Sequence, residues 1–142
     1  MKTLIKSIIV VIFIGINTIS CFAQSYSADD LRNPARAIAQ KDDWYASRIE
    51  NDDLRNATLT QLKNDSYYAG RIKDTNQERA ALALINNDES YANRIENDDL
   101  RNATLARLKN DEWYADRIKD DNLRNATLGI IKGDSWYIDN IR

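Results

Sequence analysis

The side chains that could do chemistry in this chain are carboxylates, aromatic rings and arginines. The sequence has no histidine, and its single cysteine is Cys21, close to the N-terminus. Nucleophilic sites of the Ser–His and Cys–His types need histidine, and the usual zinc sites need histidine or cysteine ligands. The composition therefore excludes these catalytic and metal sites and leaves the carboxylates to be considered.

Adjacent acids recur at Asp29-Asp30, Asp52-Asp53, Asp98-Asp99 and Asp120-Asp121. Paired carboxylates can act as a general acid and base, or they can contribute ligands to calcium. A calcium loop needs six to eight oxygens around a glycine-bearing turn, which is absent here, and catalytic residues are seldom repeated within a chain. We interpret the acids as helix caps that accept free backbone amides. We expect no enzyme activity, no metal and no cofactor.

The second candidate is a column of aromatic residues, each four positions before an arginine. Its aromatic positions are Trp44, Tyr67, Ser90, Trp113 and Trp136, and Arg48, Arg71, Arg94 and Arg117 follow them. Aromatic and arginine side chains are favoured anchors at interfaces, so the column could bind a peptide or stack on sugar rings. Alternatively, the aromatics cover the arginine stems between repeats. The candidate binding residues are Trp44, Arg48, Tyr67, Arg71, Arg94, Trp113, Arg117 and Trp136.

These residues recur because the chain is an internal repeat. Five copies of 23 residues follow one another without insertion, and the last lacks only its final residue; they span 29–51, 52–74, 75–97, 98–120 and 121–142. A fixed period in this range is typical of stacked repeat proteins. Three columns are invariant, and they hold an aspartate (42, 65, 88, 111, 134), a tyrosine (45, 68, 91, 114, 137) and an isoleucine (49, 72, 95, 118, 141).

Each copy predicts two short helices. In the second copy, apolar residues at helical spacing predict a first helix over 54–63, capped by the acids at 52–53. The invariant Asp65 is predicted to cap a second helix over 66–73. The tyrosine and isoleucine columns are predicted to form the core between layers. Such short helices are stable only when the copies stack, so the expected fold is an all-α, right-handed α-solenoid of five two-helix repeats over 29–142.

The segment Leu105 to Tyr114 resembles the leucine-rich variant and short HEAT-like repeats, in which a leucine-bearing helix leads through an acidic turn into a second helix. The chain lacks the prolines of those families, and its period is shorter than that of HEAT repeats. The resemblance covers residues 29–142 as a pattern. It implies an α-solenoid that binds protein partners.

Irregular copies carry further expectations. The first copy has Pro34 where others have alanine and Arg36 where others have leucine, which fits a solvent-facing cap. The third copy loses the Leu-Arg-Asn motif at 77–79, which we interpret as a bend or a local loosening. Since the chain stops at Arg142 without a capping helix, we expect the last repeat to leave a face that is exposed or that binds another copy or partner.

Residues 1–23 have the three parts of a secretory signal peptide: a basic start, an apolar run from Ile8 to Ile16, and the small residue Ala23. The run is too short to span a bilayer. We predict cleavage after Ala23 and export to the periplasm or beyond, with residues 24–28 as a short N-terminal segment. The alternative is a bacterial lipoprotein acylated at Cys21, although Thr18 fits that signal poorly.

Loss of Lys2 and Lys6 with the signal leaves 18 basic against 22 acidic residues, a net charge of −4. That charge argues against a general nucleic-acid binder. The leading hypothesis is an exported, non-enzymatic repeat scaffold for protein–protein interaction or self-assembly. The alternatives are a protein that binds a glycan or envelope polymer along the aromatic column, and a purely structural envelope protein.

Overall fold

The computed structural model describes residues 26–142, and within that range every regular element is an α-helix. The all-α prediction is thus confirmed for this part of the chain. The predicted signal peptide, including Cys21, lies outside it. Five long helices are α2 (Ala28–Gln40), α4 (Asp52–Lys63), α6 (Thr75–Asn86), α8 (Asp98–Lys109) and α10 (Asp121–Lys132). Five short helices alternate with them: α3 (Asp43–Ala46), α5 (Ser66–Ala69), α7 (Glu89–Ala92), α9 (Glu112–Ala115) and α11 (Ser135–Asp139).

The invariant aspartate caps each short helix, as predicted. Asp65 is the N-cap of α5, and its Oδ1 accepts a hydrogen bond from the Tyr67 amide at 2.9 Å. The helix ends at Ala69 and is therefore shorter than the predicted range of 66–73. Beyond it the Arg71 and Ile72 amides donate to carbonyls three residues back, and this tight turn directs the isoleucine into the core.

The acid pairs cap the long helices only in part: Asp120 of the pair 120–121 is the N-cap of α10, whereas the residue before the pair caps α4 and α8. Asn51, not Asp52 or Asp53, is the N-cap of α4, and its side chain accepts from the Leu54 amide. The second acid binds elsewhere, since both Asp53 oxygens accept amides from residues 73 and 74, at 3.0 and 2.9 Å. This residue therefore ties the start of a long helix to the end of its own repeat, and in the third and fifth repeats Asn76 and Asn122 take the place of the acid. Asp99 makes the same two bonds in the fourth repeat.

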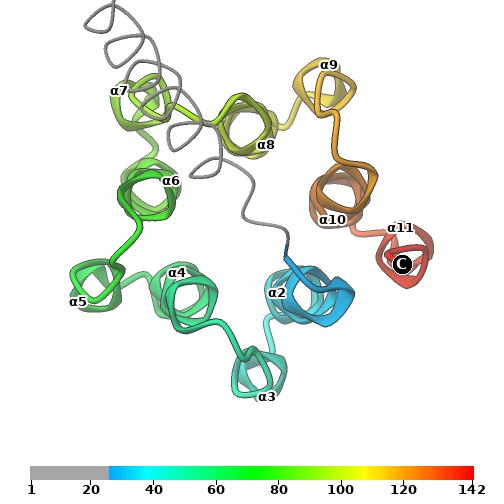
Figure 1. Cartoon of the computed structure of the whole chain (residues 1–142), viewed down its shortest axis with the longest axis horizontal. Coiled ribbons are helices and arrows are strands. Elements are labelled where there is room, and N and C mark those ends of the chain that lie inside the picture. The colour runs from blue at the N-terminus through cyan, green and yellow to red at the C-terminus, as the bar shows by residue number, and fades with distance from the viewer. Residues whose placement is uncertain (1–25) are drawn as a thin grey trace, which may run out of the picture.

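The repeats close into a ring (Figure 1). The five long helices form an inner circle and the short helices lie outside it, with α2 and α10 side by side. Each long helix packs against the long helix of the next repeat, and α10 packs against α2 in the same way. The expected open stack with a free end face is therefore wrong, because the last repeat is covered by the first.

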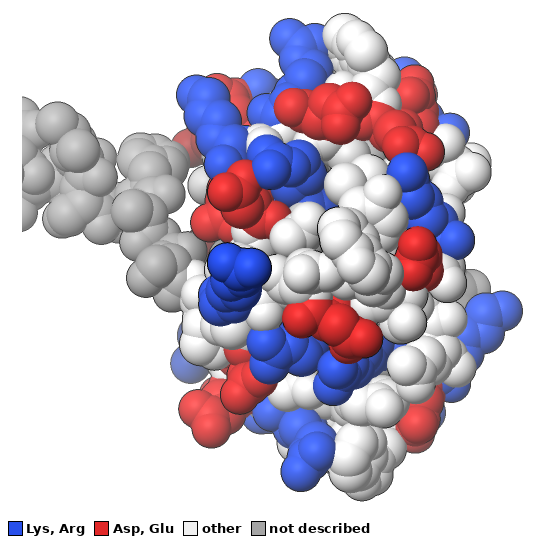
Figure 2. All heavy atoms as spheres, turned by 90° about the vertical axis from the view of Figure 1, so that its right-hand side faces the viewer, with Lys and Arg blue, Asp and Glu red and all other residues white. Residues whose placement is uncertain are grey.

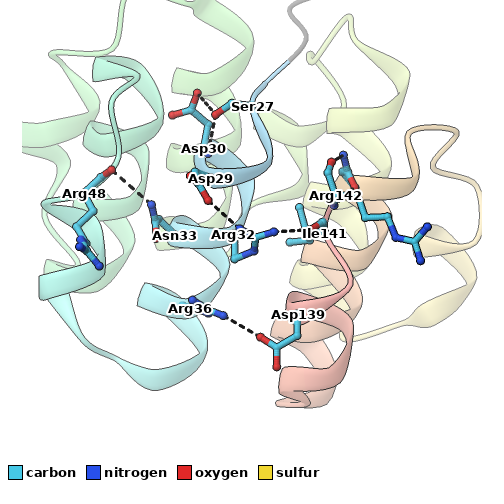
Figure 3. A network of polar contacts seen from close by, with 11 residues as sticks. Ser27, Asp29, Asp30, Arg32, Asn33, Arg36, Arg48, Asp139, Ile141 and Arg142 are labelled. Carbon is cyan, nitrogen blue, oxygen red and sulfur yellow. Dashed lines mark hydrogen bonds and ion pairs between the residues drawn. The ribbon is translucent and has the colours of Figure 1, made fainter.

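Side chains at this closing contact, which we call the seam, confirm it (Figure 3). Arg32 donates to the Ile141 carbonyl at 2.5 Å, and Arg36 forms an ion pair with Asp139 at 2.8 Å. Leu31 and Ala35 of the first repeat bury against Ala126, Ile138 and Ile141 of the last. Arg36 is thus not part of a solvent-facing cap, as its polarity had suggested, but a partner for the last repeat.

The predicted core columns are confirmed for isoleucine and qualified for tyrosine. The five isoleucines are buried, with exposed fractions of 1–7%, whereas the tyrosines are only half-buried. A column that sequence reasoning missed is buried more completely. It is the alanine at the end of the first four short helices, Ala46, Ala69, Ala92 and Ala115, at 0–1% exposure. Small side chains there let the short helix approach the long one closely.

The third repeat is neither bent nor loosened. Its helix α6 has 12 residues, as do α4, α8 and α10. Gln77, which replaces the leucine of the other copies, is buried and donates to the Tyr26 hydroxyl at 2.7 Å. Arg79 donates to the Arg94 carbonyl at 2.5 Å, so polar contacts replace the missing motif.

The inner faces of the long helices surround a narrow channel on the ring axis, with a cavity of about 100 Å³. Two layers of equivalent residues line its ends. The layer at the N-terminal ends of the helices is Leu31, Leu54, Gln77, Leu100 and Leu123, and that at the C-terminal ends is Ile38, Gln61, Leu84, Arg107 and Ile130. Between them, the hydroxyls of Thr58, Thr104 and Thr127 donate to carbonyls four residues back, so their polar groups are satisfied inside an apolar channel.

Candidate binding surface on the rim

The aromatic column lies on the short helices at the outer rim of the ring. Each aromatic is the second residue after the aspartate cap, and its amide donates to that carboxylate, as Trp113 does to Asp111 at 2.9 Å. The cap fixes the start of a one-turn helix whose buried alanine faces inward. The residue two places before this alanine consequently points away from the long helices.

All four aromatic members of the column are strongly exposed. We call them the rim aromatics: Trp44 is 54% exposed, Tyr67 63%, Trp113 55% and Trp136 62%. Large apolar side chains normally lose most of this surface in a folded domain. Their exposure at equivalent positions distinguishes them from the core columns, which the same repeat buries.

Three rim aromatics are paired with the arginine four residues later. The guanidinium carbon of Arg48 lies 4.3 Å from the Trp44 ring centroid, and that of Arg117 lies 4.4 Å from the Trp113 ring. The Arg71–Tyr67 distance is longer, 5.7 Å. In these three repeats the arginine stacks on the aromatic ring of its own repeat and not on the ring of a neighbouring repeat. A cation over an aromatic face contributes about 0.5–1 kcal/mol at exposed sites, enough to hold the two side chains together.

Two copies break the pairing in opposite ways. In the third repeat Ser90 replaces the aromatic, so Arg94 has no ring at this position to stack on. In the fifth repeat Asn140 replaces the arginine, and its side chain donates to the Trp136 carbonyl at 2.7 Å. Trp136 thus presents its indole without the guanidinium that stacks on Trp44 and Trp113.

Ring closure determines how the rim aromatics are distributed. Passing around the ring, α9, α11, α3 and α5 are consecutive, so four aromatics follow one another and Ser90 on α7 interrupts the series (Figure 1). The short helices that carry the rim aromatics are spread around the outside of the ring, so each aromatic lies on a separate helix. The sequence column is consequently a set of separate anchors and not one flat platform.

A hollow of about 500 Å³ lies beside Trp136. Polar side chains around it include Asn125, Arg124 and Asn140. Its volume is within the range of small-molecule sites. The carboxylates of Asp120 and Asp121 line it as well. An uncovered indole among amide, guanidinium and carboxylate groups is a combination that can stack on a sugar ring and bond to its hydroxyls.

Exposed ion pairs join neighbouring repeats just inside the rim. Lys63 pairs with Asp43, Lys109 with Glu89 at 3.1 Å, and Lys132 with Glu112 at 2.8 Å. The hydrogen bond from Lys63 lowers the pKa of Asp43, and the same bond raises the pKa of Lys63. Pairs of this kind contribute little to stability, but they orient the short helices α3, α7 and α9 on the following long helices.

The charges on the side of the ring that carries α9 to α11 are mixed (Figure 2). Basic and acidic side chains alternate over this face, and the described atoms form no extended patch of one sign. The acid pairs are engaged in local contacts: Asp52 bonds to Arg55, and Asp53 holds the end of its repeat. In residues 26–142 no group of three or more potential metal ligands is found. No helix in the same range is both long enough and apolar enough to cross a membrane.

Comparison with protein-family models, with characterised proteins and with solved structures found no match to this chain. The evidence on function is therefore the geometry of the ring itself and the composition of its surfaces.

Proposed function

We propose that the protein is an exported, non-enzymatic repeat scaffold that binds a protein partner through the rim aromatics and their arginines. The observation that carries the proposal is the exposure of four large aromatics, each more than half accessible, at equivalent positions of the outer helices. The proposal includes the architecture: the repeats form a right-handed α-solenoid that is closed on itself, and the rim aromatics are its binding anchors.

The physical support is the cost of leaving these rings in water. Aromatic and arginine side chains dominate the binding energy of protein interfaces. The arginine stack holds Trp44, Tyr67 and Trp113 in one orientation before binding, which lowers the ordering cost. Because the anchors point outward separately, each engages a partner on its own. A partner with several copies of the complementary site would gain affinity by multivalency.

Open-ended self-assembly loses its support. That hypothesis rested on free end faces, and Leu31, Ala35, Ile138 and Ile141 are buried against each other at the seam. Assembly through the rim remains compatible with the proposal, since a second copy of the chain would then be the partner.

The test is capture of exported proteins from the native source at moderate salt, followed by titration with the purified partner. The quadruple variant Trp44→Ala, Tyr67→Ala, Trp113→Ala, Trp136→Ala should lose the partner. Arg94→Ala should retain it, because Arg94 belongs to the repeat without an aromatic. Equal capture by the quadruple variant and the unaltered protein would reject the rim as the binding surface.

Glycan binding is the second candidate, and the hollow beside Trp136 is the observation that favours it. Trp136→Ala should abolish retention of the chain on cell-wall polysaccharide, whereas Trp113→Ala, which removes an arginine-covered ring, should leave it intact. Equal retention of both variants would remove this alternative. A purely structural envelope role predicts that neither set of surface variants has any effect, while a change in repeat number does.

Export is proposed from residues 1–23 alone. Mass spectrometry of the secreted or periplasmic chain should find Gln24 at its N-terminus. A chain beginning at Cys21 with attached acyl groups would establish the lipoprotein alternative instead.

A further inference from the structure

One cation lies inside the channel layer at the C-terminal ends of the long helices. The layer holds Ile38, Leu84 and Ile130 from three repeats, with Gln61 and Arg107 completing it. No packing requirement of the repeat calls for an arginine here, since three other copies fill the same position with an aliphatic side chain.

The Arg107 guanidinium is only partly satisfied. One terminal nitrogen donates to the Gln61 side-chain oxygen, and the Nε group is buried without a hydrogen-bond partner. The arginines at the repeat interfaces differ, because Arg101, for example, bonds both to Asp98 and to the Ile95 carbonyl. Burial lowers the pKa of Arg107 to about 10, which still leaves it charged at neutral pH.

A hollow of about 610 Å³ opens above this layer. Its charged lining residues are Arg107, Lys41, Lys63 and Asp43, and Asp43 is already paired with Lys63. The side chains therefore give the hollow an excess of positive charge. The C-terminal ends of α2, α4 and α6, which also reach it, carry partial negative charge; they help to hold the guanidinium in place and limit the affinity for an anion.

The uncharged lining is mostly aliphatic, and it consists of Ile38, Leu62, Leu84, Ile85 and Ile130 together with the amides Gln61 and Asn64. Inorganic phosphate would leave this surface unused. A carboxylate attached to a short apolar group matches both parts, because the planar guanidinium binds carboxylates through two parallel hydrogen bonds.

We infer that Arg107, oriented by Gln61, binds a small carboxylate whose apolar part rests on the aliphatic wall of the hollow. The carboxylate belongs either to a free short-chain acid or to the C-terminus of a peptide. This site is separate from the rim and is independent of the function proposed for it.

The test uses butyrate, its uncharged analogue butyramide, and a short peptide with a C-terminal valine in free and amidated forms. Binding is followed by the NMR signal of the Arg107 Nε–H group, assigned by its absence in Arg107→Ile. Butyrate or the free peptide should shift this signal saturably, and their uncharged counterparts should not. A saturable shift with butyrate assigns the site to a free short-chain acid, whereas a shift with the free peptide alone assigns it to a peptide C-terminus.

Arg107→Ile restores the residue found at this position in two other repeats. It should unfold at the same temperature or a higher one, because a partly buried charge without a carboxylate partner is removed. By ligand-observed NMR it should bind the carboxylates at least about tenfold more weakly. Arg107→Lys should show weakened binding, and Arg94→Ala, a matched loss of an exposed cation elsewhere, should bind normally. Equal binding by Arg107→Ile, equal binding of the amidated probes, or no saturable shift with any probe would overturn the inference.

Discussion

The seam between the fifth and first repeats and the interface between the fourth and fifth share a backbone contact but use different side chains. Arg124 donates to the Ile118 carbonyl at 3.2 Å, and Arg32 donates to the Ile141 carbonyl in the equivalent place. At the internal interface Leu128 packs on the preceding repeat. At the seam Arg36 stands in that position and pairs with Asp139.

The apolar volume that the seam loses by having Arg36 in place of leucine is restored by residues of the fifth repeat. Ile138 replaces the buried alanine that ends the other short helices, and Gly129 stands opposite it where the other copies have alanine or threonine. A Cβ added to Gly129 would overlap Ile138 Cγ1 and lie 3.2 Å from its Cδ1. The comparison shows that the repeat geometry determines which helices are in contact. The side-chain volumes at each interface are balanced locally, because a larger residue at one position is matched by a smaller residue opposite it.

The largest test of this equivalence is Ile141→Ala compared with Ile118→Ala. Both isoleucines are 1% exposed, so each variant should lose about 2–5 kcal/mol of unfolding free energy. Urea denaturation measures both. A nearly neutral Ile141→Ala beside a costly Ile118→Ala would mean that the seam is open in solution.

Gly129→Ala should lower the unfolding free energy by about 1–3 kcal/mol, since the new methyl group overpacks Ile138. The cost should largely disappear in the Ile138→Ala background, where space is available. A double-mutant cycle in urea measures this coupling. Additive effects would contradict a direct exchange of volume between the two positions.

Tyr26 packs against the seam cluster and has no counterpart at the internal interfaces. Burial raises the pKa of Tyr26 from 10.0 to about 12. Between these values the folded protein keeps a proton that the unfolded chain has lost. Tyr26 therefore contributes stability that is complete below pH 10 and declines as the pH rises toward 12.

Tyr26→Phe removes this contribution along with the hydrogen bond from Gln77, at a cost of about 1 kcal/mol near neutral pH. The difference in unfolding free energy between the unaltered protein and Tyr26→Phe should shrink above pH 10. Chemical denaturation over this pH range measures it. A constant difference would place Tyr26 outside the buried cluster.

The smallest effect is expected for the charges. Arg36→Asp or Asp139→Arg alone should cost up to about 1 kcal/mol, and the two together should recover most of it, because the pair is partly exposed. The same exchange at Lys132 and Glu112 is the internal control. Recovery at the internal pair but not at the seam would show that the two joints differ in geometry.

The helix pairs, the aspartate caps and the isoleucine core were predictable from the sequence, because each depends on local spacing within one repeat. The buried alanine column was missed since alanine is equally common on exposed helix surfaces. The rim aromatics were found as a column, but their separation around a perimeter depends on how the repeats curve.

Ring closure is indicated in the sequence by paired substitutions between neighbouring repeats, which an analysis of spacing within one repeat does not detect. Lysine faces the acid of the preceding repeat in three joints, as in Lys63–Asp43. Where Ser66 replaces the acid, Asn86 replaces the lysine, and the fifth-repeat Ser135 is matched by Gln40 of the first repeat only if the ring closes. Arg107 was overlooked because a single arginine at a channel position has no pattern.

Proximity of the first and last repeats tests the central claim most directly. In a Cys21→Ser background, Arg36→Cys with Asp139→Cys should be joined within one chain by a short bismaleimide reagent, which replaces the length of the arginine. Arg36→Cys with Asp116→Cys, the equivalent position one repeat away, should remain unlinked. Mass spectrometry of dilute protein distinguishes the products. Efficient linkage of the first pair alone is the predicted result, and failure to link it, or equal linkage of both pairs, would contradict a closed ring.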